Sequence, residues 1–398
     1  MQIEDLALQR SKYKHLSDTE WRWFLQQVEG RERTADKLPT FATIDDWWYP
    51  VRLSCEQCSS ELTARYKAEI LSPYISHHTS SAMADLTGGY GVDTYFISQL
   101  FEHTDYVEQN AELCRIAAHN FSRPTPSLPK GKEIRVHCCS AEEFLKTAGQ
   151  YDLIFLDPAR RDAHGSKVFR LEDCTPNVIE MLPTLLAHGQ RLMIKLSPML
   201  DLTQAIIHLT PYTLHLSWDI YVVAVKNEVK ELLLLSGGSG QITAIDLAKK
   251  EQAFVFTREQ ESNCQNKSEG LKPSNQAEGL NFLYEPSAAI LKAGAYKLVA
   301  QRFGLSKLDV NTHLYASDTL VPHFPGRVWR IMPTSVLTKG KELRQANVLC
   351  RNYPLTPEQL KKKLHLRDGG TDYVIGCRIN GKPTLLFAQR IEDIHAEG

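Results

Sequence analysis

The feature that most constrains the fold is an alternation of short apolar runs with helical stretches, which begins after Pro73. Strands that alternate with helices are joined by crossover connections and form a mostly parallel sheet with helices on both faces. The runs that we predict as strands cover residues 82–86, 105–108, 134–138, 153–156, 192–196 and 220–225. The sequence therefore predicts an α/β fold with a doubly wound sheet.

The last two strands of this sheet are predicted to pair antiparallel. Only residues 226–229 separate the apolar run at 217–225 from the next one at 230–235, and this link is too short for a crossover helix. A parallel sheet that ends in an antiparallel hairpin differs from the all-parallel dinucleotide-binding fold. Residues 241–246 and 253–257 are expected to form another hairpin.

The segments on either side of the sheet have a different character. Up to about residue 72 the chain is rich in charges and Trp, and the capping pattern Ser17-Asp18-Thr19-Glu20 predicts a helical N-terminal region. Residues 258–279 are polar and are predicted to be a linker or a disordered loop. Beyond them, one or two small α+β modules are indicated by helices at 287–303 and 357–364 and by strands at 329–332, 346–350, 373–377 and 384–387.

The composition excludes several classes of function. The formal net charge of this 398-residue chain is -1, so any nucleic-acid contact must come from a local basic patch. No apolar run approaches the roughly 18 residues that a membrane span needs, and the start Met-Gln-Ile-Glu-Asp has no secretory pattern. Because nine is an odd number of cysteines, we expect reduced thiols and a cytoplasmic protein.

The loop after the first predicted strand carries the main ligand-binding signal. In Asp85-Leu86-Thr87-Gly88-Gly89-Tyr90-Gly91 the glycines let the backbone turn sharply and approach a ligand beyond the carboxyl end of the strand. A bulky residue at Gly89 or Gly91 is therefore expected to abolish binding. Thr94 stands where a dinucleotide motif has its third glycine, which disfavours a nicotinamide cofactor; a purely structural turn is the alternative. The expected cofactor ligands in this region are Asp85, Thr87, Gly88, Gly89, Gly91 and Asp93.

Two further strand ends are expected to complete a site for an adenosine ligand. Glu108 ends the second strand about 20 residues downstream, where ribose hydroxyls need an acceptor; the alternative is a solvated acid. At the end of the third strand, a loop around the adenine would use Ser140, Ala141 and Glu142. The preceding Cys138-Cys139 is interpreted as a buried apolar pair.

The fourth strand runs directly into Asp157-Pro158-Ala159-Arg160-Arg161-Asp162. An apolar strand that ends in Asp-Pro places a carboxylate and a rigid turn at the carboxyl edge of the sheet. We interpret Asp157, Pro158 and Arg160 as catalytic, with Asp157 holding an amino group of the cofactor or accepting a hydrogen bond from a nucleophile. Arg160 and Arg161 could bind phosphate or stack on a base, or be surface arginines paired with nearby acids. Lys195, which ends the fifth strand, faces the same cleft or is an ordinary sheet-edge lysine.

The C-terminal part of the chain is basic. From residue 326 to the end there are 13 Lys and Arg against 7 Asp and Glu. Arg351-Asn352-Tyr353-Pro354, Lys361-Lys362-Lys363 and Arg367 combine cations with an aromatic ring, which suits an RNA backbone and an exposed base; a solvated helix face is the alternative for the three lysines. The residues predicted to contact RNA are Arg161, Lys195, Arg351, Lys361, Lys362 and Arg367.

Two motifs that could bind a metal ion lack the partners that such a site needs. Cys55-Glu56-Gln57-Cys58 has no second cysteine pair at zinc spacing, and His77-His78 has no carboxylate or thiol nearby. We therefore expect no metal.

With the loop at 85–91, Glu108 and the turn at 157–160, the chain resembles the class I S-adenosylmethionine-dependent methyltransferases. It is similar to a bacterial group of them with a ferredoxin-like segment and a C-terminal THUMP-like domain, and it distantly resembles trimethylguanosine synthase-like enzymes. The closer likeness lies in Glu56-Gln57-Cys58-Ser59-Ser60-Glu61, Ala64-Arg65-Tyr66-Lys67, Asp157-Pro158-Ala159-Arg160-Arg161 and Leu366-Arg367-Asp368-Gly369-Gly370.

The resemblance implies a doubly wound, seven-stranded, Rossmann-like sheet with an N-terminal helical region and small C-terminal α+β domains. The implied parts are an N-terminal helical region (1–75), the methyltransferase domain (76–257), a linker (258–279), a ferredoxin-like segment (280–325) and a THUMP-like domain (326–398). It also implies S-adenosylmethionine as cofactor and RNA, either tRNA or rRNA, as substrate.

One departure from the amino-group methyltransferases matters. Those enzymes have an aromatic residue after Asp-Pro-Pro or Asn-Pro-Pro, whereas this chain has Pro158-Ala159-Arg160, so stacking on a flipped base is not implied. An RNA-binding protein with a non-catalytic methyltransferase scaffold and a small-molecule methyltransferase stay open as alternatives.

Overall fold

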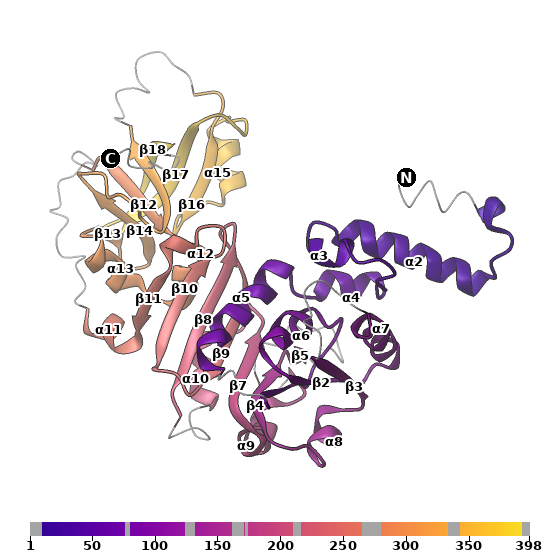
Figure 1. Ribbon diagram of the computed structural model, residues 1–398. Helices are drawn as coiled ribbons and strands as arrows, with labels where there is room; N and C mark the ends of the chain where they lie inside the picture. The colour runs from indigo at the N-terminus through magenta and orange to yellow at the C-terminus, as the bar shows by residue number, and fades with distance from the viewer. Residues whose placement is uncertain are drawn as a thin grey trace. The chain divides into compact units, whose positions relative to one another are not determined.

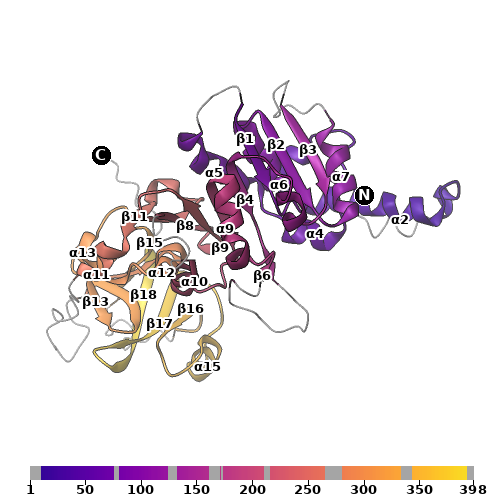
Figure 2. The same cartoon turned by 90° about the horizontal axis from the view of Figure 1, so that it is seen from below.

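The computed structural model describes residues 10–75, 80–123, 132–160, 171, 174–209, 216–264, 280–332 and 343–391. The chain divides into two compact units. The first consists of Met1–Trp218 and Leu232–Ser239, and the second of Asp219–Glu231 and Gly240–Gly398. Figures 1 and 2 show the labelled helices and strands of each unit in two views.

The main sheet has nine strands in the order β11-β10-β8-β9-β7-β4-β1-β2-β3. Neighbours from β7 to β3 pair in parallel, and β9 pairs antiparallel with β7. The strands are β1 (Ala82–Asp85), β2 (His103–Glu108), β3 (Glu133–Cys138), β4 (Tyr151–Leu156), β7 (Gly189–Leu196), β8 (Trp218–Val225), β9 (Glu228–Ser236), β10 (Gln241–Asp246) and β11 (Phe254–Thr257). The predicted doubly wound α/β fold is confirmed.

The sheet is larger than the seven strands predicted. The strands from β3 to β8 match the predicted set, and β8 is linked to β9 through Lys226 and Asn227, whose φ angles of 52° and 63° suit a two-residue hairpin turn. The expected second hairpin forms between β10 and β11. It joins the sheet because β10 pairs in parallel with β8, and Ile242 and Ala244 are then buried.

Helices cover the main sheet, as a buried parallel sheet requires. Strand β4 has no exposed face, since Leu153, Ile154, Phe155 and Leu156 are all buried. The helices that follow the strands are α6 (Val92–Ile97), α7 (Ala111–Phe121), α8 (Ala141–Leu145), α9 (Val178–His188) and α10 (Leu202–Leu209). A separate two-stranded sheet pairs β5 (Ala159–Arg160) with β6 (Cys174–Thr175).

The N-terminal helices pack on the helix that follows the glycine loop. They are α2 (Asp18–Thr34), α3 (Pro39–Ala42), α4 (Arg52–Gln57) and α5 (Glu61–Leu71), and the predicted capping box of Ser17 and Glu20 begins α2. Phe41 and Trp47 pack against Tyr95 of α6, and the Trp47 Nε1 donates to the Tyr90 hydroxyl at 3.1 Å. The N-terminal region is therefore part of the core around the glycine loop.

A second sheet, in the C-terminal unit, has the order β13-β14-β12-β15-β18-β17-β16. Its strands are β12 (Phe282–Pro286), β13 (Ser306–Asp309), β14 (Thr312–Ser317), β15 (Gly326–Ile331), β16 (Asn347–Arg351), β17 (Asp372–Ile379) and β18 (Lys382–Ile391). The sequence did not predict β12, β13 and β14. The predicted helix at 287–303 is two helices, α12 (Ala288–Ala293) and α13 (Tyr296–Arg302), because Gly294 ends the first with a φ of 83°.

The linker predicted at 258–279 is wrong for its first residues. These form α11 (Arg258–Asn263), which begins with a capping box of Thr257 and Gln260. The Glu261 carboxylate accepts the backbone N–H groups of Lys297 at 2.9 Å and Leu298 at 2.8 Å, and so binds the start of α13. Residues 265–279 lie outside the described residues.

The remaining described helices are α15 (Pro357–Lys363) and the short 3-10 turns η1 (Arg10–Tyr13), η2 (Ser72–Tyr74), η3 (Ser98–Leu100) and η6 (Lys250–Gln252). In the described ranges, no helix has both the length and the apolar character that a membrane crossing requires.

Candidate active site

The glycine loop between β1 and α6 has the tight backbone that its sequence predicts. Gly89 and Gly91 have φ angles of 56° and 82°, a region that favours glycine. A Cβ on Gly88 would lie 2.1 Å from the Tyr106 ring, and one on Gly91 would lie 2.6 Å from Phe121. A Cβ on Gly89 would meet only the Thr87 carbonyl oxygen, at 3.8 Å. Gly89 therefore leaves its backbone open to a ligand.

Glu108 holds this loop from the neighbouring strand. One carboxylate oxygen accepts the Gly89 N–H at 2.9 Å, and the other accepts the Asn110 N–H at 2.8 Å. The Tyr106 hydroxyl donates to the Gly89 carbonyl oxygen at 2.6 Å. The predicted ribose acceptor thus lies directly beside the glycine backbone.

A cavity of about 320 Å³ lies along the loop. Its lining includes all the residues predicted to bind the cofactor: Asp85, Thr87, Gly88, Gly89, Gly91, Asp93, Glu108, Ser140, Ala141 and Asp157. Glu142 lines it as well. Ser140 also accepts the Glu143 N–H at 3.1 Å and so caps α8.

Residues that sequence reasoning missed form another part of the lining. Ser54, Gln57, Cys58 and Ser59 come from α4 and the turn before α5, in the N-terminal region. Thr175 and Pro176 come from β6 and the residue after it. For Gln57, Cys58 and Ser59 the sequence signal that could have indicated the site was the family likeness of residues 56–61.

Asp85 links the two motif loops at the carboxyl edge of the sheet. It accepts the Thr87 N–H at 3.0 Å and the Thr94 hydroxyl at 2.5 Å. The Thr87 hydroxyl in turn accepts the Asp157 N–H at 2.6 Å. Thr94, which stands where the dinucleotide motif has its third glycine, therefore donates a hydrogen bond that holds Asp85.

The pKa of Asp85 is raised to about 7, chiefly because its side chain is buried. The hydrogen bonds from Thr94 and Thr87 oppose this shift, and the nearby carboxylates of Asp93 and Asp157 add to it. Asp85 can therefore gain or lose a proton near neutral pH.

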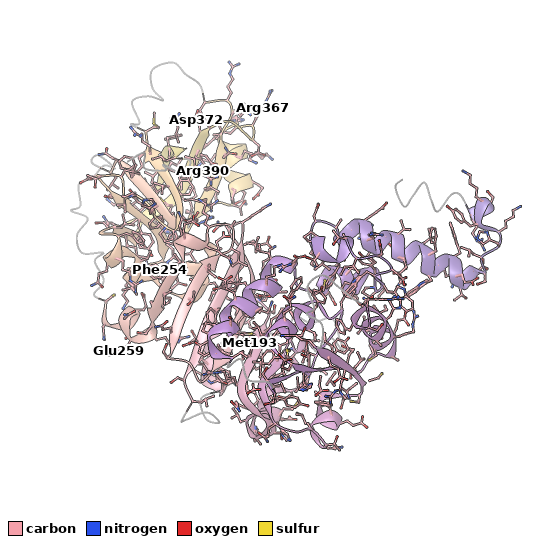
Figure 3. The ribbon with its side chains drawn as sticks, in the orientation of Figure 1. Met193, Phe254, Glu259, Arg367, Asp372 and Arg390 are labelled. Atoms are coloured by element: carbon pink, nitrogen blue, oxygen red, sulfur yellow. The ribbon has the colours of Figure 1, made fainter. Side chains whose placement is uncertain are left out.

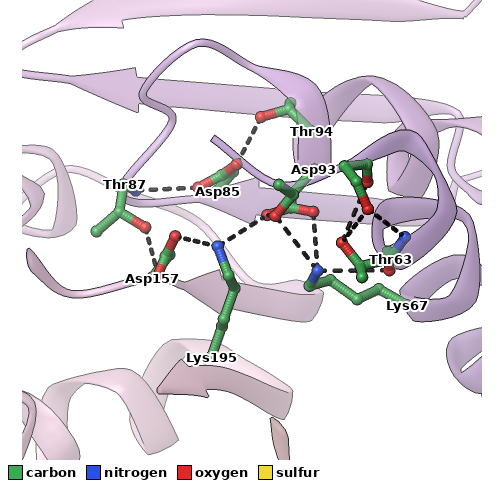
Figure 4. A network of polar contacts seen from close by, with 10 residues as sticks. Thr63, Lys67, Asp85, Thr87, Asp93, Thr94, Asp157 and Lys195 are labelled. Carbon is green, nitrogen blue, oxygen red and sulfur yellow. Dashed lines mark hydrogen bonds and ion pairs between the residues drawn. The ribbon is translucent and has the colours of Figure 1, made fainter. Parts of the chain in front are cut away.

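Four charged side chains form an alternating series next to Asp85 (Figure 4). Buried Lys67 pairs with Asp93 at 3.1 Å, Asp93 lies 3.5 Å from the ammonium of Lys195, and Lys195 donates to Asp157. Ser59 also donates to Asp93, at 2.7 Å. Burial alone would raise the pKa of Asp93, but Lys67 and Lys195 outweigh it and the pKa lies below its usual value.

The turn after β4 is only partly described. Asp157 is 39% exposed and therefore accessible from the cavity, Pro158 is buried, and Arg160 lies in β5 opposite Cys174 of β6. Arg161 lies outside the described residues. The roles predicted for Pro158, Arg160 and Arg161 stay predictions.

The cysteines next to the cavity do not have the predicted arrangement. Cys138 is exposed and Cys139 is half-buried and lines the cavity, so the prediction of a buried pair is wrong. The reason is that β3 is an edge strand of the sheet. Burial raises the pKa of Cys55 to about 12, so this thiol stays protonated.

Within the described ranges, no cluster of three or more His, Cys, Asp or Glu could hold a metal ion.

The basic residues predicted to contact RNA have varied surroundings in the C-terminal unit. Lys362 and Arg367 are exposed, and Arg367 can be located in Figure 3. Lys361 pairs with Asp368 at 2.6 Å. Arg351 binds Glu285, a buried carboxylate that also binds Arg327. Arg351 thus has a structural partner that its local sequence does not reveal.

Comparison with known proteins adds independent findings. Residues 282–325 match a ferredoxin-like domain, and residues 326–390 match a THUMP-like domain. Two Mycobacterium tuberculosis proteins, from strains CDC 1551 and H37Rv, are described as S-adenosylmethionine-dependent methyltransferases. Each is 21% identical to this chain over 369 residues, covering 90% of this chain and 92% of the relative.

A solved structure from Porphyromonas gingivalis W83, described as a candidate methyltransferase, is 32% identical to this chain. It matches with a TM-score of 0.79 and covers 95% of this chain and 92% of its own. The chain belongs to the class I S-adenosylmethionine-dependent methyltransferases with a C-terminal THUMP-like domain. The predicted family and cofactor of this methyltransferase are confirmed.

The site of this methyltransferase fits the cofactor in two respects. The backbone at Gly89 is open to a ligand, and Asp85, Asp93, Glu108 and Asp157 supply carboxylates along the cavity. S-adenosylmethionine carries a net positive charge, so these carboxylates suit it.

Proposed function

We propose that this methyltransferase modifies RNA, either tRNA or rRNA, with the methyl donor in the cavity beside the glycine loop and the acceptor at the Asp157 turn. The observation that supports an RNA substrate best is the THUMP-like match over residues 326–390, in a region with 13 basic and 7 acidic residues from residue 326 onward. THUMP domains in general are implicated in tRNA binding, and the family resemblance therefore implies an RNA substrate.

The residues along the cavity suit distinct parts of the donor. Glu108 would accept the ribose hydroxyls, since its carboxylate already lies at the Gly89 backbone. Ser140 and Ala141 would contact the adenine, and Asp85 would attract the cationic end of the donor. The backbone would approach the donor closely at Gly89, where no Cβ intervenes, while the glycines at 88 and 91 leave room for the rings of Tyr106 and Phe121.

S-adenosylmethionine supplies a methyl group, which is transferred from its sulfonium by an in-line displacement that leaves the thioether. The protein's contribution is then alignment and charge placement, rather than covalent chemistry. Asp157 is accessible from the cavity, and its backbone N–H is fixed by Thr87. Its carboxylate would accept a hydrogen bond from the acceptor group and orient it toward the methyl.

A methyl-transfer assay on RNA tests this proposal. Tritiated S-adenosylmethionine and the protein are added to total RNA from a strain that lacks the gene and to RNA from the wild-type strain. Label should enter the RNA of the deletion strain only, because the sites in wild-type RNA are already methylated. Asp85→Ala and Asp157→Ala should abolish labelling, whereas Asp368→Ala, which removes a 72% exposed carboxylate, should not.

The same assay separates the alternatives. Full labelling of RNA by both Asp85→Ala and Asp157→Ala would contradict the proposed site. Binding of RNA without binding of S-adenosylmethionine, measured by calorimetry, would favour a non-catalytic RNA-binding protein. Donor binding with no labelling of either RNA would favour a small-molecule substrate.

A further inference from the structure

The N-terminal helical region supplies two side chains that contact Asp93, a residue that lines the cavity. Lys67 is in the middle of α5, and Ser59 precedes the same helix. Both contact Asp93, which lines the cavity at the start of α6. Neither residue belongs to the methyl-donor motifs at 85–91 and 157–160.

The Lys67 side chain has an exposed fraction of 0%. Removing its ammonium from water is energetically unfavourable unless partners compensate for the lost hydration. Its partners are the Asp93 carboxylate at 3.1 Å, the Ser59 hydroxyl at 3.4 Å and the Thr63 carbonyl oxygen at 3.4 Å. Among these three partners, Asp93 carries the opposite charge. The contact between Lys67 and Asp93 therefore helps to compensate for burying this lysine.

Asp93 contacts the N-terminal region through both carboxylate oxygens and Lys195 through one of them. Oδ1 pairs with Lys67, while Oδ2 accepts the Ser59 hydroxyl and lies 3.5 Å from the Lys195 ammonium. Lys195 makes its closer contact with Asp157. The contacts of Asp93 with Lys67 and Ser59 are shorter than its contact with Lys195, although among the described residues Oδ1 has only the ion pair with Lys67 and no hydrogen bond (Figure 4).

We propose that Lys67 is a positioning residue for methyl transfer, which acts through Asp93 to hold Lys195 against the Asp157 carboxylate. This inference rests on the proposed function in one respect, namely that Asp157 orients the methyl acceptor. Lys67 itself touches neither donor nor acceptor. The N-terminal helical region is then a component of the catalytic site, in addition to its role in the core.

Lys67→Met tests the proposal because it removes the charge and keeps most of the side-chain volume. Asp93 is left with Lys195 as its nearest cation and should draw Lys195 away from Asp157. We expect kcat for RNA methylation to fall about 10- to 100-fold, as for a misplaced catalytic group, while the Kd for S-adenosylhomocysteine changes less than about threefold. Arg65→Met is the matched control, since Arg65 lies on the same helix and pairs with Glu61.

A rescue variant separates positioning from a merely structural role. In Lys67→Met/Asp93→Asn the pull of Asp93 on Lys195 is removed, so kcat should recover at least about tenfold relative to Lys67→Met alone. A kcat at the wild-type level in Lys67→Met, or no recovery in the double variant, would overturn the proposal. If Lys67→Met does not fold, Ser59→Ala removes a weaker partner of Asp93, and a loss of kcat of about threefold is expected; an unchanged kcat would overturn the proposal.

A crystal structure of Lys67→Met with S-adenosylhomocysteine decides the question without an RNA substrate. The Lys195 ammonium should lie within hydrogen-bond distance of Asp93 and no longer contact Asp157. An unchanged contact between Lys195 and Asp157 would overturn the positioning role even if RNA is methylated. Displacement of Lys195 together with no RNA labelling by the wild type would instead contradict the proposed function and support the positioning role.

Discussion

The protonation of Asp85 should control donor binding at the residue scale. Burial raises the pKa of this carboxyl to about 7, so below pH 7 a cationic donor must first displace a proton from it. Between pH 6 and pH 8 the affinity for S-adenosylmethionine should therefore rise about tenfold and then level off. Calorimetry at both pH values, in buffers of different ionisation enthalpy, should detect proton release at pH 6 only.

Two comparisons make this prediction specific to Asp85. S-adenosylhomocysteine lacks the sulfonium charge, so its affinity should depend less on pH. Asp85→Asn should remove the dependence for both ligands. Equal affinities of the wild-type protein for S-adenosylmethionine at pH 6 and pH 8 would contradict the role of Asp85.

Alanine substitutions in the glycine loop should differ in their effects. Gly88→Ala places a Cβ 2.1 Å from the fully buried ring of Tyr106 and should reduce the free energy of unfolding by about 1–3 kcal/mol and abolish donor binding. Gly89→Ala meets no such clash, and its φ of 56° should cost about 1 kcal/mol. Chemical denaturation and titration with S-adenosylhomocysteine check this order; an equal loss in both variants would contradict it.

Residues on local motifs could be predicted from the sequence, whereas residues placed by tertiary contacts could not. Asp85 and Glu108 end their strands and Asp157 follows one, and parallel strands bring their carboxyl ends to one edge. The residues around Lys67 in the sequence predict only a helix. Nothing in them indicates that this lysine is buried against Asp93. Arg351 likewise has the sequence of a free basic side chain, because its partner Glu285 lies 66 residues away.

The pairing of β12 with β15 connects the two C-terminal family matches at the scale of elements. The strands pair in register from Phe282 opposite Arg330 to Pro286 opposite Gly326. The buried Glu285 of β12 binds Arg327 of β15 and Arg351 of β16. The matches at 282–325 and 326–390 thus share one sheet, and a truncation between them would leave β12 with β14 on one side and without β15 on the other.

Glu285→Gln should weaken this sheet. The variant keeps the size of the side chain but removes the charge shared by two arginines, which are 28% and 37% exposed and so retain part of their hydration. We expect the free energy of unfolding to fall by about 1–3 kcal/mol. Asp368→Asn, at an exposed ion pair, should change it by less than about 1 kcal/mol. Urea denaturation of both variants measures the difference, and an unaltered Glu285→Gln would refute the structural role.

Elements with strong periodicity were predicted well, and short ones were not. The strands of the parallel sheet are apolar runs separated by helices, a pattern with few alternative folds. Strands β13 and β14 are joined by a tight turn and have a mixed burial pattern, so their local sequences lack this signal. The polar composition of α11 likewise concealed a helix, which depends on its capping box and on the contact of Glu261 with α13.

At the scale of the whole molecule, the chain combines a unit that contains the candidate donor site with a basic C-terminal region, and the near-neutral overall charge conceals this difference. The main sheet and the donor loop follow from sequence periodicity and motif spacing. The completion of the site by the N-terminal helices does not, because it depends on aromatic packing of Phe41 and Trp47 against α6. Substrate recognition must therefore be tested by changing charge on the intact chain rather than by removing parts of it.

The basic residues at the end of α15 should contribute to RNA affinity through phosphate contacts. Lys362, Lys363 and Arg367 are exposed, and replacing all three with Gln should weaken RNA binding and leave the affinity for S-adenosylhomocysteine unchanged. Each lost contact to single-stranded RNA reduces the slope of log K against log salt by about 0.7, so the slope should fall by up to about 2. The control carries the same charge change at Lys12, Lys14 and Arg22, three exposed residues of the N-terminal region. Equal slopes for the two triple variants, measured by filter binding over a salt series, would mean that RNA does not select this surface.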